Sequence, residues 1–182
     1  MTDQITIRPA ELRDIAAVTR IYAHSVWHGT ASFELDPPDE AEMTRRYQVL
    51  QAGGYPYLVA EQMGAVVGYA FAGPYRARPG YRWTVEDSVY VDTAAHRRGL
   101  GRALLERLIA ESEAHGFRQM IAVIGDSSKQ AASIGLHEAL GFRHVGILEN
   151  VGFKHDRWLD SVLMQRELGD GAKTNPPMPP SS

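Results

Sequence analysis

Two glycines and three arginines stand together where a predicted strand meets a predicted helix. In the stretch VYVDTAAHRRGLGRALL they are Gly99 and Gly101, set among Arg97, Arg98 and Arg102. A helix N-terminus offers unpaired backbone N–H groups and roughly half a positive charge. Glycine lets an anion approach those groups closely, and arginine adds charge and forked donors. The stretch therefore predicts a cradle for an anion such as a diphosphate, with a glycine-rich turn between solvated arginines as the alternative.

This joint does not match two other phosphate-binding motifs. A P-loop needs a Lys followed by Ser or Thr, and a dinucleotide fingerprint needs a third glycine where this chain has Leu104. A strand, then [Q/R]-x-x-G-x-[G/A], then a helix resembles the loop with which GNAT N-acetyltransferases bind the acetyl-CoA diphosphate. The chain reads HRRGLG here, with His96 at the position where the family has Gln or Arg.

The resemblance to GNAT N-acetyltransferases extends from about residue 4 to residue 168. It is closer still to one branch, the phosphinothricin and methionine sulfoximine acetyltransferases. The matching stretches are TASFE (30–34), YRARPGYRWTVEDSVYV (75–91), SIGLHEALGF (133–142) and GFKHDRWLDSVLMQREL (152–168). The resemblance implies an α/β (α+β) fold with a mixed, mostly antiparallel sheet flanked by helices. It also implies acetyl-CoA as co-substrate, a small amino-acid-like substrate and a homodimer.

The same resemblance implies the acetyl-CoA contacts. The backbone of Val89, Tyr90 and Val91 would bind the pantetheine arm as an added strand does. The diphosphate would contact the residues of the glycine joint, which are Arg97, Arg98, Gly99, Leu100, Gly101 and Arg102. GNAT enzymes often have an asparagine that contacts this arm. The corresponding region here reads DSSKQAAS, in which Gln130 is the nearest match and Lys129 the second.

A carboxylate on a predicted central strand is the candidate base. Acetylating an amine requires removal of an amine proton, polarisation of the thioester carbonyl and protonation of the leaving thiolate. In WTVEDSVYV, Glu86 shares one strand face with Thr84, Ser88 and Tyr90. Burying a carboxylate costs free energy unless it is paired or functional. Matching family positions imply that Glu86 takes the amine proton, with Asp87 as the weaker rival; a strand glutamate paired with an arginine is the alternative.

The chain has His137 where many GNAT enzymes have a tyrosine that can protonate the thiolate. The motif L-Y-x-x-x-G-F reads LHEALGF here. Histidine can do the same work near neutral pH, or it can hold the region of the CoA sulfur through a hydrogen bond. A histidine packed on a helix is the alternative.

An arginine-rich loop, PYRARPGYR, precedes the strand that carries Glu86. Arginine binds a carboxylate through two parallel hydrogen bonds, as an amino-acid substrate would require. The resemblance places Arg76 and Arg78 at that carboxylate and Phe33 as an apolar wall, with Glu34 or a partner subunit as further polar contacts. The expected substrate-binding residues are Phe33, Arg76, Arg78, Glu86, Asp87 and Ser88. A solvated loop is the alternative.

Hydrophobic spacing and turn residues predict the elements that hold these groups. The predicted strands cover 4–8, 55–62, 65–73, 83–91 and 120–125, followed by a strand pair in 142–151 and 156–168. The predicted helices cover 11–27, the segment after Asp39, the segment from the glycine joint to about 115, and 130–140. We expect a single domain over residues 1–168 and a disordered tail over residues 169–182.

Bulk composition excludes several classes of protein. The chain has 182 residues, 44% of them apolar, a net charge of −3 and no cysteine. It has no overall basic footprint for nucleic acid, no thiol for a disulfide or metal site, and no apolar run long enough for a membrane span. His24 and His28 lack the intervening glutamate of an H-E-x-x-H site, so we expect no metal. The expected location is the cytoplasm, since the N-terminus has no signal-peptide pattern.

Three functions remain in competition. The first is acetyl-CoA-dependent N-acetylation of an amino-acid analogue such as phosphinothricin, methionine sulfoximine or methionine sulfone. The second is a GNAT enzyme for another amine, such as a protein N-terminus or a polyamine; Arg76 and Arg78 argue against a cationic polyamine. The third is a non-catalytic CoA-binding module, against which Glu86 beside a complete cradle argues weakly.

Overall fold

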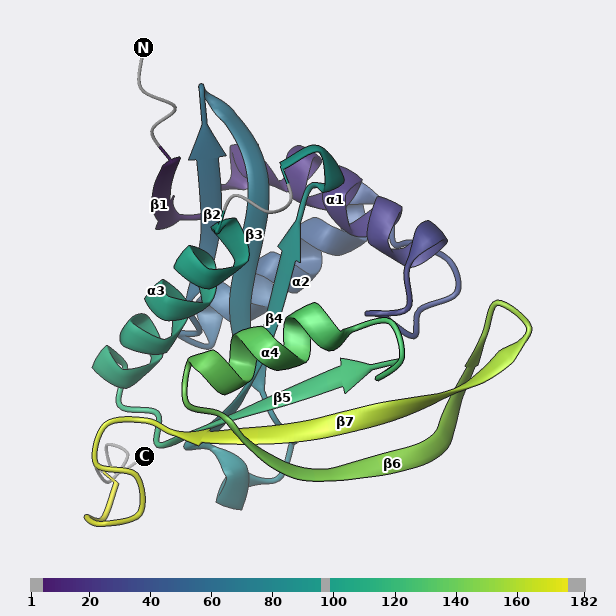
Figure 1. Ribbon diagram of the computed structural model, residues 1–182. Helices are drawn as coiled ribbons and strands as arrows, with labels where there is room; N and C mark the ends of the chain where they lie inside the picture. Colours follow the sequence, from purple (N-terminus) through teal and green to yellow (C-terminus); the bar gives the residue numbers. More distant parts are fainter. Residues whose placement is uncertain (1–4, 96–98, 177–182) are drawn as a thin grey trace.

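The computed structural model describes residues 5–95 and 99–176, which form one sheet with helices on both faces (Figure 1). The strands are β1 (Ile5–Pro9), β2 (Tyr57–Gln62), β3 (Ala65–Pro74), β4 (Thr84–Val91), β5 (Gln119–Gly125), β6 (Arg143–Lys154) and β7 (Arg157–Glu167). The helices are α1 (Ile15–His28), α2 (Glu40–Ala52), α3 (Leu100–Ala114) and α4 (Ala131–Ala139), with short 3-10 turns at Leu12–Asp14, Pro79–Tyr81 and Thr93–Ala95. The expected mixed fold is confirmed.

The strand order is β1-β2-β3-β4-β5-β7-β6, and only the β4–β5 pair is parallel among the described residues. β4 and β5 pair from Thr84–Gln119 to Glu86–Ile121, and beyond Glu86 they separate (Figure 1). β3 continues to pair with β4 as far as Val91. The second half of β4 is therefore open on the side that faces β5.

Each face of the sheet has its own apolar core. On one face, Leu104, Leu105 and Leu108 of α3 are fully buried against β-strand residues such as Val85 and Met120. On the other face, α1 and α2 pack on an aromatic surface made by β2 and β3; the buried members include Val18, Val26, Tyr47, Tyr57 and Tyr69. Burying each large apolar side chain contributes about 1.5–3 kcal/mol, so both helix pairs are held firmly on the sheet.

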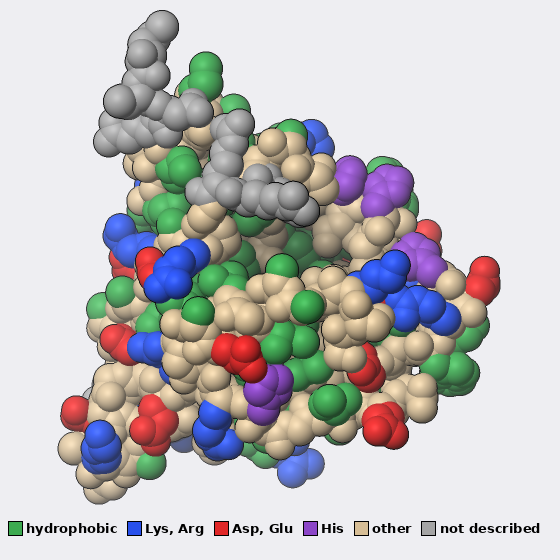
Figure 2. Space-filling model, viewed as in Figure 1, with side chains coloured by type: hydrophobic (Ala, Val, Ile, Leu, Met, Phe, Trp, Pro, Cys, Tyr) green, Lys and Arg blue, Asp and Glu red, His purple; other side chains and the backbone are tan. Residues whose placement is uncertain are grey.

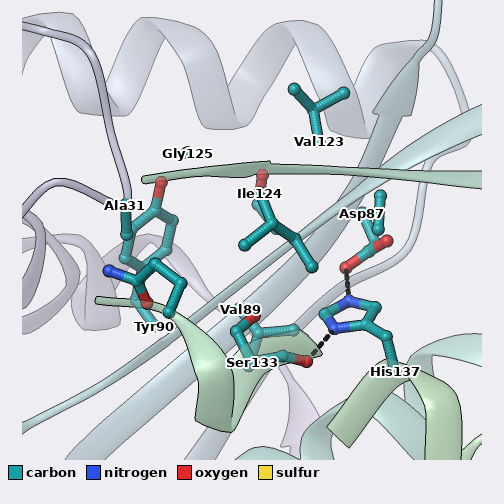
Figure 3. A pocket seen from close by; sticks show the side chains of 12 residues that line it. Ala31, Asp87, Val89, Tyr90, Val123, Ile124, Gly125, Ser133 and His137 are labelled. Carbon is teal, nitrogen blue, oxygen red and sulfur yellow. Dashed lines mark hydrogen bonds and ion pairs between the residues drawn. The ribbon is translucent and has the colours of Figure 1, made fainter. Parts of the chain in front are cut away.

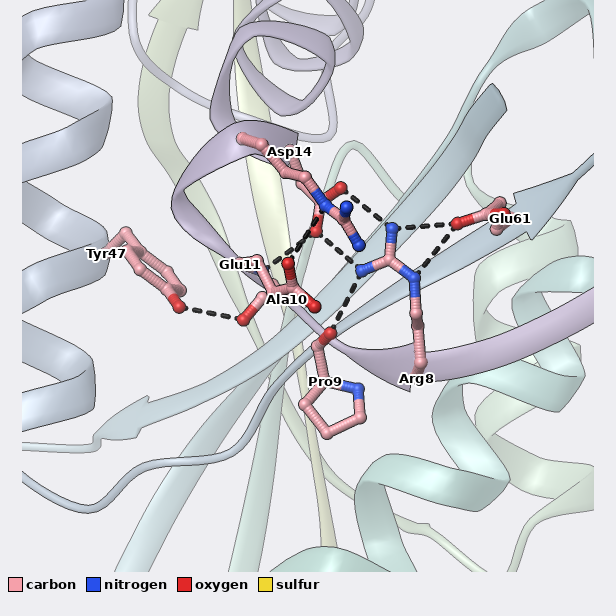
Figure 4. A network of polar contacts seen from close by, with 8 residues as sticks. Arg8, Pro9, Ala10, Glu11, Asp14, Tyr47 and Glu61 are labelled. Carbon is pink, nitrogen blue, oxygen red and sulfur yellow. Dashed lines mark hydrogen bonds and ion pairs between the residues drawn. The ribbon is translucent and has the colours of Figure 1, made fainter. Parts of the chain in front are cut away.

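A polar network fixes the entry into α1 (Figure 4). Arg8 on β1 donates to both carboxylate oxygens of Asp14, at 2.7 and 2.9 Å, and to Glu61 on β2 at 2.8 Å. The hydrogen bonds from Arg8 lower the pKa of Asp14 despite its burial. Asp14 also accepts from the Glu11 N–H at 2.8 Å, and the Tyr47 hydroxyl of α2 donates to the Ala10 carbonyl at 2.8 Å. Both helices are thereby tied to the start of the sheet.

The element boundaries follow the predicted turn residues closely. Asp39 caps α2 by accepting from the Glu42 N–H at 2.8 Å, and Gly116 and Gly141 have the positive φ expected just after a helix. The first helix differs from the prediction: a separate 3-10 turn precedes α1, because the Asp14 carboxylate ties back to the Glu11 backbone.

The start of the C-terminal tail also differs from the prediction of disorder. Residues 169–176 form turns in which the Gly171 N–H donates to the Leu168 carbonyl and the Lys173 N–H to the Asp170 carbonyl. Arg118 reaches the tail at the Asn175 carbonyl, 3.4 Å away. Hydrogen bonds to Leu168 and from the Arg118 side chain thus hold a segment that has few apolar side chains to bury. Residues 177–182 lie outside the described part of the chain.

Candidate functional site

A cavity lies where β4 and β5 separate, and we name it the splay cavity (Figure 3). Its walls come from residues 87–90 of β4, residues 122–125 of β5, Ala31, and one side of α4 with its N-cap, where Gln130, Ser133 and His137 line it. The cavity is therefore bounded on one side by the β4 backbone that has lost its neighbouring strand. Such a backbone can pair with an extended, amide-containing molecule.

A buried histidine–aspartate pair closes one end of the splay cavity. His137 Nε2 lies 3.0 Å from Asp87 Oδ2, and His137 Nδ1 lies 2.7 Å from the Ser133 carbonyl oxygen (Figure 3). The two side chains are 4% and 3% exposed. A carbonyl can only accept, so Nδ1 carries a proton and Nε2 shares a second proton with the carboxylate. Burial lowers the pKa of His137, but the hydrogen bond and charge of Asp87 outweigh burial and raise it.

These contacts bear on the predicted role of His137. The ring lies in the cavity wall, edge-on to Phe142 at a centroid distance of 4.9 Å. Both ring nitrogens are engaged, so the ring can deliver a proton only by exchanging a partner. Proton donation to the thiolate stays a prediction, and the contacts describe a ring fixed in place by Asp87 and Ser133.

Glu86 lies on the opposite face of β4, in a second cavity of about 430 Å³. We name it the acceptor cavity; β2, β3, β4, α1 and α2 form its walls, and Ser88 and Tyr90 line it beside Glu86. Burial, and then the charge of neighbouring Asp87, raise the pKa of Glu86. A carboxylate with a raised pKa is better matched to removing a proton near neutral pH.

The acceptor cavity has an aromatic wall and a charged rim that the sequence did not reveal. The rings of Tyr69 and Tyr90 stack at 5.2 Å, and the buried Tyr69 hydroxyl has no hydrogen-bond partner among the described residues. At the rim, Arg46 on α2 donates to Glu34 at 2.7 Å and to Glu42 at 2.8 Å. Tyr69 and Arg46 looked like ordinary core and helix-surface positions, since they meet only in the folded chain. Glu34, expected as a further polar contact to the substrate, does line this cavity.

A third hollow, the coenzyme groove, runs between α1 and the end of β4. The predicted pantetheine contacts Val89, Tyr90 and Val91 line it, as does Gln130, which also lines the splay cavity. The rival Lys129 is exposed and lines neither hollow. The geometry therefore favours Gln130 among the two candidates.

The glycine joint forms the start of α3. Gly99 is the N-cap with a left-handed φ of 75°, and no side chain caps the helix. The first intrahelical hydrogen bond runs from the Ala103 N–H to the Gly99 carbonyl at 3.0 Å. The amides of residues 100–102 therefore have no intrahelical acceptor, and within residues 5–95 and 99–176 no hydrogen bond from them is seen, as an anion site requires. Arg102 pairs with Glu106 at 2.8 Å, and Arg97 and Arg98 lie outside the described residues.

Gly101 lies where α3 approaches both β4 and α4. A Cβ atom added there would lie 3.6 Å from Leu136 and 3.9 Å from Val91. The Leu100 side chain is buried in the core, so this residue presents its backbone rather than its side chain. The joint thus offers main-chain donors in a narrow space.

The predicted substrate arginines are not brought to the cavities. Arg76 lies over the rings of Tyr75 and Tyr81, at 5.0 and 5.6 Å, and is exposed like Arg78. Neither arginine lines the splay cavity, the acceptor cavity or the coenzyme groove. Phe33 is also displaced from the expected position, since its ring packs against the glycines of β5 and β6.

The described residues can also be compared with the requirements of a metal site, a charged binding surface and a membrane span. Within residues 5–95 and 99–176, the structure forms no cluster of three or more histidine and acidic side chains that could hold a metal ion. His24 and His28 lie side by side, with ring centroids 4.6 Å apart. On the face in Figure 2, charges of both signs are interspersed. No helix in the described part of the chain is long and apolar enough to span a membrane.

Comparison with known proteins finds acetyltransferases by family model, by sequence and by structure. The model of the acetyltransferase (GNAT) domain matches residues 7–163. A phosphinothricin N-acetyltransferase of Alcaligenes faecalis is 52% identical over 94% of this chain and 86% of its own length. A methionine sulfoximine/sulfone acetyltransferase of Salmonella typhimurium is 45% identical over 92% of this chain and 97% of its own. The crystal structure of a phosphinothricin acetyltransferase from Sinorhizobium meliloti, in complex with AcCoA, superposes with a TM-score of 0.92, at 48% identity, over 95% of this chain and 93% of that one.

Proposed function

The chain belongs to the GNAT acetyltransferase family, and we propose that it transfers the acetyl group of acetyl-CoA to the amino group of a small amino-acid analogue. Analogues of the phosphinothricin and methionine sulfoximine or sulfone type are the substrates named for its relatives. The observation that carries this proposal is the placement of Glu86. Its carboxyl lies in a cavity on one face of β4, and directly beyond it the backbone of the same strand is no longer paired with β5.

Acetyl-CoA would be held mainly by main-chain groups. The free amides of residues 100–102 suit the diphosphate, because they combine unpaired donors with the positive end of α3. The backbone of Val89 and Tyr90, which β5 does not pair, suits the amides of the pantetheine arm. Val91 lines the same groove, and Gln130 lies at the junction of the two hollows. This arrangement leads the thioester into the splay cavity.

The acceptor amine would approach from the acceptor cavity. Glu86 takes the amine proton, directly or through a water, so that the neutral nitrogen can attack the thioester carbonyl. The Asp87–His137 pair lies beside the reaction on the far face of β4 and contains a shared proton. His137 is therefore the proposed source of the proton that the leaving thiolate receives. We keep Arg76 and Arg78 as proposed contacts to the substrate, reached through movement of the 75–82 loop. Phe33, whose ring packs on Gly125 and Gly152, is proposed to act on the substrate only by holding its own loop in place.

A thiol-release assay with acetyl-CoA tests this function. The panel contains phosphinothricin, methionine sulfoximine, methionine sulfone, free amino acids, a polyamine and a peptide N-terminus. We expect turnover with the analogues and little with the polyamine, because the acceptor cavity has Arg45 and Arg46 at its rim. Preference for the peptide or the polyamine would support the second function, and binding of acetyl-CoA with no turnover on any amine would support a CoA-binding module.

We also propose that two copies form a homodimer through β6. This strand forms the border of the sheet, and Val145, Ile147, Val151 and Phe153 on it are 52–54% exposed. An exposed apolar strand with an open edge is a favourable surface for pairing with an identical copy. Sedimentation should show a dimer that Ile147→Lys converts to a monomer; a wild-type monomer would refute the proposal.

The cytoplasm is the proposed place of action. The chain has no cysteine that an oxidising compartment would use, and acetyl-CoA is made inside cells. With a net charge of −3, the enzyme is proposed to work on free small molecules without nucleic acid or membrane as a partner.

A further inference from the structure

One short loop, residues 29–34, borders all three hollows of the site. It leaves the end of α1 and crosses toward β5 and β6. Ala31 lines both the splay cavity and the coenzyme groove, and Glu34 lines the acceptor cavity. Tyr22 of the acceptor cavity also depends on this loop, since its hydroxyl lies 2.9 Å from the Ser32 hydroxyl. The position of the loop therefore sets the shape of the space in which the two substrates meet.

The loop is fastened first by the ring of Phe33. This ring packs between Gly125 at the end of β5 and Gly152 on β6. A Cβ atom at Gly125 would lie 2.6 Å from Phe33 Cε1 and 2.8 Å from the Thr30 carbonyl oxygen, and one at Gly152 would also overlap the ring. Only glycine at these two positions leaves room for the Phe33 ring, so β5 and β6 together form its binding space.

A second fastening joins Thr30 to Asp126. The Thr30 hydroxyl donates to Asp126 Oδ2 at 2.7 Å, and Arg157 at the start of β7 donates to the same carboxylate. Asp126 is 2% exposed and has a left-handed φ of 58°. The β5–α4 connection therefore holds the loop from the side of the splay cavity.

The third contact that holds the loop places a buried lysine ammonium on a backbone carbonyl. Lys154, the last residue of β6, is 4% exposed and donates from Nζ to the Ser32 carbonyl at 2.8 Å. Burial lowers the pKa of this ammonium, partly offset by the charge of Glu34. A buried cation costs free energy that an apolar side chain of similar length would avoid. Its contribution here is a strong hydrogen bond to the backbone of the loop.

We propose that Lys154 is a positioning residue for acetyl transfer: it fixes loop 29–34 across the sheet and thereby sets the affinity for the acceptor substrate. The inference rests on the proposed function, because it assigns the acceptor to the cavity that Glu34, Tyr22 and Glu86 line. Lys154 lines none of the three hollows and acts through Ser32. Ser32 is tied to two residues of the acceptor cavity, because its hydroxyl lies 2.9 Å from the Tyr22 hydroxyl and accepts from the Glu34 N–H at 3.2 Å. Removal of Lys154 should therefore affect the acceptor more than acetyl-CoA.

The test compares Lys154→Met with Lys154→Arg, which keeps a cationic donor, and with Lys173→Met, which removes an exposed lysine from the tail. Amide hydrogen exchange in residues 29–35 is measured on the protein without substrates. Steady-state kinetics then give KM separately for acetyl-CoA and for the amino-acid analogue. Thermal unfolding is followed for each variant.

Lys154→Met should increase exchange in the loop and raise the acceptor KM on the order of tenfold, with the acetyl-CoA KM within about twofold of wild type. Lys154→Arg should recover part of the acceptor affinity, and Lys173→Met should match wild type. Unchanged exchange and unchanged acceptor KM in Lys154→Met would overturn the proposal, as would a lower melting temperature with both KM values unchanged. If wild type acetylates no amino-acid analogue, the proposed function fails, while hydrogen exchange still decides whether Lys154 holds the loop.

Discussion

The two faces of β4 offer their ligands different kinds of contact. On the proposed coenzyme side, the groups are mostly main chain: the backbone of residues 89 and 90, which β5 does not pair, and the amides of residues 100–102, which have no acceptor within α3. On the acceptor side, they are side chains, namely Glu86, the stacked tyrosines and the arginines of α2. Backbone groups keep their positions when side chains change, whereas a cavity made of side chains changes with each substitution. The first face suits a constant ligand and the second suits a ligand that differs between relatives.

The largest effect should come from the acceptor face at Glu86. Glu86→Gln keeps the shape of the side chain but removes the base, so kcat should fall by about 10²-fold or more. Calorimetry should find acetyl-CoA affinity unchanged, because the coenzyme contacts are on the other face. A wild-type rate would remove Glu86 from the mechanism, and lost coenzyme affinity would show that the two faces are coupled.

The same variant has an opposite expected effect on folding. The pKa of Glu86 is raised in the folded protein by burial and by Asp87. As pH rises above the ordinary glutamate range, the unfolded chain ionises first, so wild-type stability is lost as pH rises through the folded pKa. Glu86→Gln should therefore melt at a higher temperature than wild type at neutral pH, and the two should converge in acid.

The second-largest effect should come from the coenzyme face at Gly101. Gly101→Val places a branched side chain between α3, β4 and α4, where a Cβ already contacts Leu136. Coenzyme affinity should weaken roughly tenfold by calorimetry, since the diphosphate and the new side chain compete for the approach to the amides. Ala110→Val, on the exposed side of the same helix, is the control for β-branching. Equal affinity in both variants would contradict a main-chain cradle.

A smaller, selective effect is expected at Arg78. If this exposed arginine closes over a bound carboxylate, Arg78→Ala should raise KM severalfold for an amino-acid analogue and less for the corresponding amide. Arg46→Ala gives the comparison, because Arg46 lies at the rim of the acceptor cavity. A selective effect at Arg46 with none at Arg78 would transfer the carboxylate contact from the 75–82 loop to α2.

The smallest effect should be a displacement of the pH profile by a change on the coenzyme face. The charge of Asp87 contributes to the raised pKa of Glu86 across the strand. Asp87→Asn should therefore move the ascending limb of kcat/KM toward lower pH. Because Asp87 also raises the pKa of His137, the proposed acid, the descending limb should move toward lower pH as well. An ascending limb that stays at the same pH would show that Glu86 does not govern it.

The sequence predicted the local structure of the glycine joint better than the make-up of the acceptor cavity, because the residues of the joint are neighbours in the chain. The strand, the glycines and the helix of the joint are consecutive, so their spacing alone predicts an uncapped helix start, which Gly99 confirms. Alternation in β4 likewise predicted that Glu86 and Asp87 lie on opposite faces, and they do. Arg46 and Tyr69 could not be found in this way, because each looks like an ordinary helix-surface or core residue until distant elements pack together.

Phe33 and Lys154 also depend on contacts between residues far apart in the chain, which a local sequence pattern does not predict. The sequence suggested a substrate contact for Phe33, but two glycines far along the chain provide space for its ring. No local pattern marks Lys154 as a positioning residue, since a lone lysine before a turn is usually exposed. Its burial depends on the end of β6 and the loop after α1 meeting in space, which no local pattern records.

The separation of β4 from β5 also affects how the protein avoids self-association. An unpaired strand is a template on which other chains can add and aggregate. Here residues 87–90 of β4, which β5 does not pair, are inside the molecule, with Ala31, the end of β5 and α4 around them. A strand from another chain would need the space that these elements occupy. The part of β4 that can serve a ligand is therefore shielded from other sheet edges by the protein's own elements.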